Sequence, residues 1–228
     1  MTSPESLGAA PGSEHASDPY GLRPTWRGWL HFAAFLVVMP AGIFLLTAAD
    51  SIGAQVAVAV YWASLAGLFA TSASYHRLAR THRAVLWFRR ADHSMIYVLI
   101  AGTYTPLCLI ALPRIWGIPM LVVAWVTALA GVILKMMRLG VGERSSGSWL
   151  YIVMGWGAVI TLPVLVTSLN AWQLVLLGVG GVLYTVGAVV LGKRRPDPVP
   201  TRFGYHEVWH SFTIAAGACH FALVASLL

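Results

Sequence analysis

Long apolar segments separated by short polar loops dominate the chain. Each is long enough to cross a hydrocarbon layer of about 30 Å, which takes roughly 20 helical residues. Because the segments are continuous and do not alternate in polarity, the pattern excludes a membrane β-barrel. It therefore predicts an all-α integral membrane protein of seven transmembrane helices. The predicted spans are Trp29–Ala49, Gly53–Tyr75, Ala91–Leu112, Trp116–Met137, Trp149–Ser168, Trp172–Leu191 and His206–Leu227.

Composition and charge agree with this class. The 228 residues are 58% hydrophobic and only 10% charged, too apolar for a water-soluble domain of this size. A net charge of +7 would suggest nucleic acid in a soluble protein. Here the cations lie in short loops, where they meet anionic headgroups, so membrane lipids are the expected partners and nucleic acid is not.

The first segment differs from the rest. Residues 1–24 are rich in Ser, Pro and Gly and show little hydrophobic periodicity. They also lack the basic segment followed by an apolar core that a signal peptide needs. We therefore predict a disordered cytoplasmic tail over residues 1–24 and one membrane domain over residues 25–228.

The positive charges define an orientation. Fourteen of the fifteen Lys and Arg residues precede the first span or follow the second, fourth and sixth, and only Arg114 lies on the other side. The positive-inside rule then places the N-terminus in the cytoplasm and the C-terminus outside. We expect a multi-pass protein of the plasma membrane, the inner membrane of the cell.

Ionisable residues at membrane depth are costly and indicate function. His206 and His210 are four residues apart, so both imidazoles lie on one helix face and can reach one cation. With Glu207 they match H-E-x-x-H, in which two histidines bind zinc and the glutamate acts as a base. The alternative is a pair of interfacial histidines bonded to the backbone or to headgroups.

A third histidine and two further polar residues are expected at the same level. The topology brings His76 there, which completes a three-histidine zinc site with one open position. Asp92 would then orient or deprotonate a water molecule, and Ser72, one turn from His76, could hydrogen-bond in the same cavity. The alternative role of Asp92 is the N-cap of the third span. Glu207 is the competing base.

The remaining histidines at membrane depth have other expected roles. His31 is expected to be an interfacial residue. His220 is ten residues beyond His210, about 15 Å deeper by helical rise, so it cannot share the same metal ion. We expect it to be buried and hydrogen-bonded.

Three blocks of the chain carry a resemblance to a known family: Ser72-Ala-Ser-Tyr-His76, Asp92-His-Ser-Met-Ile-Tyr-Val-Leu-Ile-Ala-Gly-Thr-Tyr-Thr-Pro106 and His206-Glu-Val-Trp-His210. In this order and at these intervals they resemble the hemolysin III family, the bacterial branch of the progestin and adipoQ receptor (PAQR) family. The resemblance covers nearly the whole membrane domain. It implies seven helices and a Zn²⁺ ion held by three histidines, here His76, His206 and His210. It also implies that an aspartate and a serine, matching Asp92 and Ser72, complete the site through bound water.

Three functions follow as hypotheses. The wider superfamily includes alkaline ceramidases, so the resemblance suggests a zinc-dependent hydrolase of an amide or ester bond in a membrane lipid, with Asp92 favoured over Glu207 as the base. The second is a non-catalytic membrane-homeostasis or sensor protein with structural zinc. The third, suggested by the family name, is a cytolytic protein. The lipid substrate or ligand and the oligomeric state are left open.

Overall fold

The computed structural model describes residues 24–138 and 149–228, and seven helical spans in them are long and apolar enough to cross a membrane. The predicted seven-helix all-α fold is therefore confirmed. The predicted N-terminal tail, apart from Pro24, lies outside the described residues. In chain order the elements are α1 (Trp29–Ala48), α2 (Ile52–Leu78), α3 (His82–Pro106), η1 (Leu107–Ala111), α4 (Arg114–Arg138), α5 (Trp149–Trp156), η2 (Gly157–Thr161), α6 (Leu162–Ser168), α7 (Ala171–Lys193) and α8 (Tyr205–Ala225).

Short polar residues begin several of the helices. Ser51 caps α2 by accepting a hydrogen bond from the Ala54 amide, and Asn170 opens α7 with a capping box that it shares with Gln173. Two spans depart from simple α-helix. The π-helical turn η1 continues α3, and the 3₁₀ turn η2 separates α5 from α6.

The start of α3 differs from the prediction. The helix begins at His82, nine residues before the predicted start at Ala91, and its N-cap is Thr81, whose hydroxyl accepts a hydrogen bond from the Ala84 amide. The alternative interpretation of Asp92 as an N-cap is therefore wrong. Hydropathy missed the first turns because they carry arginines, although Val85 in the same segment is buried.

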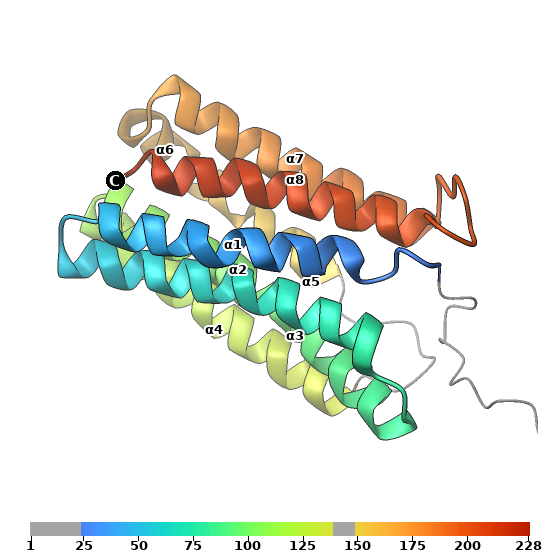
Figure 1. Ribbon diagram of the computed structural model, residues 1–228. Coiled ribbons are helices and arrows are strands. Elements are labelled where there is room, and N and C mark those ends of the chain that lie inside the picture. The colour runs from blue at the N-terminus through green and yellow to red at the C-terminus, as the bar shows by residue number, and fades with distance from the viewer. Residues whose placement is uncertain (1–23, 139–148) are drawn as a thin grey trace, which may run out of the picture.

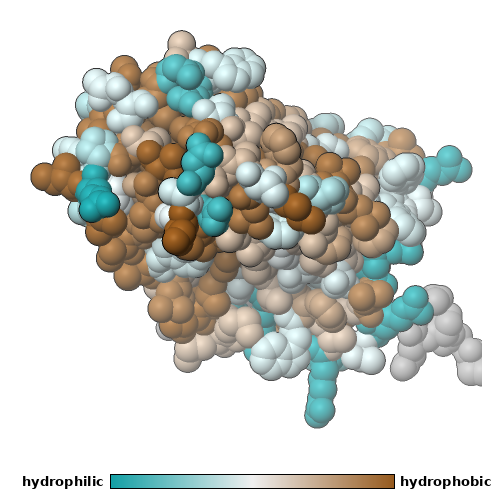
Figure 2. Space-filling view, turned by 60° about the vertical axis from the view of Figure 1, so that its left-hand side comes forward, coloured by the Kyte–Doolittle hydropathy of each residue, from teal (hydrophilic) through white to brown (hydrophobic). Residues whose placement is uncertain are grey.

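The helices run antiparallel to their chain neighbours and form one bundle (Figure 1). The most extensive contacts join α7 to α8, α2 to α3, α3 to α4 and α1 to α2. Tyr61, Leu65 and Tyr97 are among the fully buried side chains between them. Outward-facing apolar side chains such as Val37, Phe44 and Val123 remain exposed, and hydrophobic residues cover most of the face seen in Figure 2. This surface suits a lipid surround.

Glycines let several of the helices approach closely. A Cβ atom at Gly187 of α7 would lie 3.0 Å from the Cβ of Phe212 on α8, and one at Gly131 of α4 would lie 2.6 Å from the Tyr97 ring on α3. By contrast, Gly178 of α7 faces open space within 4 Å. Gly187 and Gly131 therefore serve packing inside the bundle.

The cations of the described chain gather at one end of the bundle. Except for Arg114, every described Lys and Arg lies at or near the end where α1, α3, α5 and α8 begin and where α2, α4 and α7 finish. In Figure 1 this is the right-hand end, and Leu228 lies at the other.

We expect Gly131→Ala to destabilise the protein, because the added methyl group meets the buried Tyr97 ring and the helices must move apart. Overpacking of this kind costs about 1–3 kcal/mol, and each kcal/mol lowers the melting temperature by about 2–4 °C in a protein of this size. Thermal unfolding in detergent measures the effect. Gly178→Ala is the matched control and should melt at or slightly above the wild-type temperature. Equal melting temperatures for the two variants would contradict the packing assigned to Gly131.

Candidate metal centre

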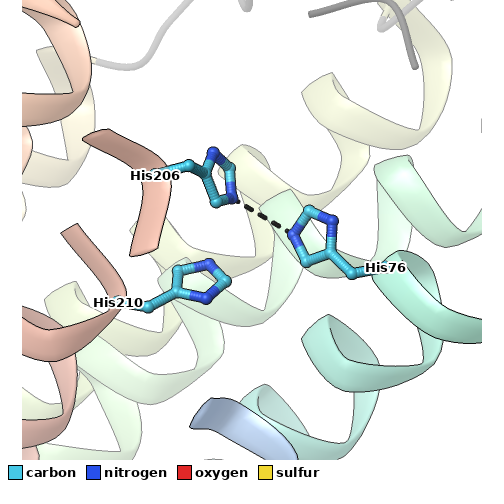
Figure 3. Close-up of side chains that lie close together, drawn as sticks. All are labelled: His76, His206 and His210. Atoms are coloured by element: carbon cyan, nitrogen blue, oxygen red, sulfur yellow. Dashed lines mark hydrogen bonds between the residues drawn. The ribbon is translucent and has the colours of Figure 1, made fainter. Parts of the chain in front are cut away.

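Three histidines converge at the cationic end of the bundle. His76 lies in the last turn of α2, and His206 and His210 lie in the first two turns of α8. Their side chains are buried, with exposed fractions of 5%, 7% and 0%. One nitrogen of each lies within 4.8 Å of one nitrogen of both others. Figure 3 shows the rings pointing from the two helices into the same space.

Local structure fixes these positions. The first turn of α8 is closed by Glu207, whose Oε2 accepts a hydrogen bond from the Gly204 amide at 2.8 Å. His206 and His210, one helical turn apart, then face α2 together. On the other side the chain enters α1 through Gly28, which has a left-handed φ of 84°. A Cβ atom there would lie only 2.9 Å from the Cβ of His76, so glycine allows α1 to begin directly against the site.

The donor set fits a divalent metal ion. His76 Nε2 and His206 Nε2 are 3.2 Å apart, joined by the dashed line in Figure 3. Two nitrogens bound at the usual zinc distance in a tetrahedral site would be about 3.3–3.4 Å apart. Both ring nitrogens of His210 are buried and have no hydrogen-bond partner among the described residues. A cation between the rings would satisfy nitrogens that otherwise pay the cost of desolvation.

Asp92 and Ser72 form a polar pair beside the histidines. Ser72 lies one helical turn before His76 on α2, and its hydroxyl hydrogen-bonds the Asp92 carboxylate of α3. Both side chains are buried. Asp92 Oδ2 is also 3.8 Å from Nδ1 of His93. The Asp92 carboxylate is not among the ligand atoms that lie within 4.8 Å of one another, which come from His76, His206 and His210. The structure therefore does not make Asp92 a fourth ligand.

Glu207 is engaged elsewhere. Its carboxylate is fully buried, and Oε1 accepts a hydrogen bond from the guanidinium of Arg27, which precedes α1. The other oxygen caps α8 at Gly204. With both oxygens bonded, Glu207 joins the start of α1 to the start of α8.

His31 was missed by the sequence reasoning. It lies in the first turn of α1, where its side chain is only 2% exposed and its ring stacks on that of His210. Gly28 has a left-handed φ and α1 begins only at Trp29, so helical spacing does not relate Arg27 to His31 and no local pattern indicated the role of His31. His220, in contrast, is buried as expected, with Nε2 3.4 Å from the Leu177 carbonyl oxygen.

Comparison with known proteins identifies the family. Residues 21–221, which include all three histidines, match the family described as Haemolysin-III related. The chain is 34% identical over 199 residues to the Hemolysin-3 homolog of Bacillus subtilis (strain 168), covering 85% of this chain and 89% of that protein. It is also 34% identical over 198 residues to Hemolysin-3 of Bacillus cereus, covering 85% and 86%. The resemblance carried by the three sequence blocks is thereby confirmed, and the chain belongs to the hemolysin III family of multi-pass membrane proteins.

Proposed function

We propose that this protein is a metal-dependent hydrolase that cleaves an amide or ester bond in a membrane lipid, with Zn²⁺ held by His76, His206 and His210. The observation that carries the proposal is the meeting of three buried imidazoles, with a buried Ser72–Asp92 pair whose serine lies one helical turn from His76. Three histidine ligands with a fourth position left open are typical of catalytic zinc. Three nitrogen ligands also suit other divalent ions, and zinc is the one that the family resemblance implies.

The residues around the histidines have separate roles in this proposal. Zinc, when bound, would polarise a lipid carbonyl and make a water molecule more acidic. Asp92 takes the proton of that water as general base, and the Ser72 hydroxyl holds the carboxylate in place. The ion pair between Arg27 and Glu207 keeps α8 aligned, so that His206 and His210 face α2.

The depth of the site suits a lipid linkage. His76 is two residues from the end of α2, and His206 is the second residue of α8. The site thus lies near the ends of the spans, where the ester and amide linkages of lipids are found, and the acyl chains lie deeper. The guanidinium carbon of Arg77 is 4.4 Å from the ring centre of Trp29, a pairing suited to the headgroup boundary. From the positive-inside rule we infer that this boundary belongs to the cytoplasmic leaflet and that the N-terminus is cytoplasmic.

A non-catalytic protein with structural metal is the second candidate. The near-complete burial of the three histidines favours it, because a closed site holds an ion without admitting a substrate. In that case the ion would fasten α2 to α8 and stabilise the fold. The names of the two Bacillus relatives suggest haemolysis as a third candidate, which lysis of red cells by the purified protein would test.

We expect the purified protein to contain about one zinc ion per chain, as a three-histidine site holds one. Single replacement of His76, His206 or His210 by Ala should remove the ion, because each supplies one of the three nitrogens. Metal content measured by mass spectrometry tests this. His220→Ala is the matched control, a buried histidine outside the group, and should keep the zinc. Zinc that persists in all three site variants would exclude the proposed ligand set.

Replacing Asp92 with Asn should leave the zinc bound and reduce lipid hydrolysis by about 10²–10⁴-fold, the usual contribution of a general base. The measurement is release of fatty acid from a membrane lipid extract by the purified protein, followed by mass spectrometry. Glu207→Gln is the comparison variant. It keeps an oxygen for the Gly204 cap and should retain most of the turnover while melting at a lower temperature, because Arg27 loses its partner. The reverse pattern, with activity lost only in Glu207→Gln, would make Glu207 the base.

A further inference from the structure

We propose that His31 is a ligand-binding residue of the metal centre, and that its imidazole hydrogen-bonds the oxygen atom of the water or lipid carbonyl that enters the site. The inference rests on the proposed function, since it assumes an ion at the three histidines. It adds a residue from α1, a fourth helix, to a site otherwise built from α2 and α8 with Asp92 of α3.

The His31 imidazole is a buried polar group without a partner among the described residues. His31 is 2% exposed, and neither of its ring nitrogens has a hydrogen-bond partner among the described residues. An imidazole always carries at least one N–H donor, and the second nitrogen is either an acceptor or another donor. Burying both without partners is unfavourable. Because the described side chains provide no partner, one is expected from a molecule that occupies the site.

Two neighbouring rings cover the His31 ring. His31 stacks face to face on His210, with ring centres 3.8 Å apart and planes within 11°. Phe69 also contacts it, with ring centres 5.0 Å apart and planes inclined by 55°. A nitrogen donates in the plane of its own ring, so neither nitrogen of His31 can hydrogen-bond the face of the stacked His210. The nitrogens must therefore be satisfied at the edges of the His31 ring, in a plane that lies next to the His210 ring.

The position of His31 favours a hydrogen bond to a small molecule in the site over direct coordination of the ion. His31 is not in the group whose nitrogens all lie within 4.8 Å of one another. It nevertheless lies only one ring thickness from His210. A residue at that distance is suited to hydrogen-bond whatever fills the open position of the ion, which is a common role for side chains around a metal site.

The start of α1 is held by contacts with both α2 and α8. Four residues before His31, the Arg27 guanidinium pairs with the buried Glu207 of α8. Between them, Gly28 packs against His76 and Arg77 of α2. The segment that carries His31 is therefore held by both helices that carry the three histidines. A binding residue needs this kind of rigid support if it is to act on one atom of a ligand.

The test uses the full-length protein in detergent, loaded with Co²⁺ and titrated with acetohydroxamate, a small oxygen ligand for metal ions. Visible absorption of the cobalt reports both occupancy and ligand binding. His31→Phe retains a flat ring that can stack but has no nitrogen. We expect it to hold cobalt as the wild type does and to bind acetohydroxamate about 10–100-fold more weakly, the loss expected when a supporting residue of a metal site is removed.

Two further variants make the result specific. His31→Gln keeps a hydrogen-bond donor and should recover part of the lost affinity. His220→Phe is the matched control, the same substitution at a buried histidine away from the site, and should bind acetohydroxamate as the wild type does. If His31→Phe does not fold, His31→Leu provides the same comparison.

Three results would overturn the inference, and they are distinguishable. Wild-type acetohydroxamate affinity in cobalt-loaded His31→Phe would make the ring a packing residue. Loss of cobalt from His31→Phe, with retention in His220→Phe, would make His31 a direct ligand. A wild-type protein that binds no Co²⁺ would remove the proposed function itself, and the role of His31 with it.

Discussion

Imidazole nitrogens cannot be buried without a polar partner, and this constraint dominates the cationic end of the bundle. Helices α2 and α8 meet there through His76, His206 and His210. A helix contact that served packing alone would use apolar side chains, as in the hydrophobic cluster that contains Leu65 and Phe69. The protein instead concentrates nitrogen donors, which is favourable only when a cation or another polar group joins them. The geometry of the neighbouring helices is consistent with holding such a group.

The ion pair of Arg27 with Glu207 illustrates how that end is held together. Both side chains are buried, so each charge depends on the other for compensation. The same carboxylate caps α8, and the same arginine precedes the glycine that packs against His76. One pair of residues thus links the starts of α1 and α8 to the end of α2. The H-E-x-x-H pattern is present, but its glutamate has a structural use in this protein.

The sequence predicted the seven spans and the grouping of the three histidines, because hydropathy and the four-residue spacing of His206 and His210 are local signals. The early start of α3 was hidden by arginines, which lower hydropathy but do not prevent a helix. The environments of Glu207 and His31 depend on which face of α1 meets α8. That contact joins residues 180 positions apart for Arg27 and Glu207, and no local pattern contains it.

The length of α3 has a geometric consequence for Asp92. With η1 the span covers 30 residues, or about 45 Å at 1.5 Å per residue, which exceeds a hydrocarbon thickness of about 30 Å. The difference of about 15 Å matches the first ten residues of α3, which carry Arg83, Arg89 and Arg90. Of these, Arg83 is exposed and suits a lipid phosphate, whereas Arg89 is fully buried in the bundle. Asp92 is ten residues beyond the start of α3 at His82. Its carboxylate therefore lies about 15 Å along the helix axis from that end, well inside the helix.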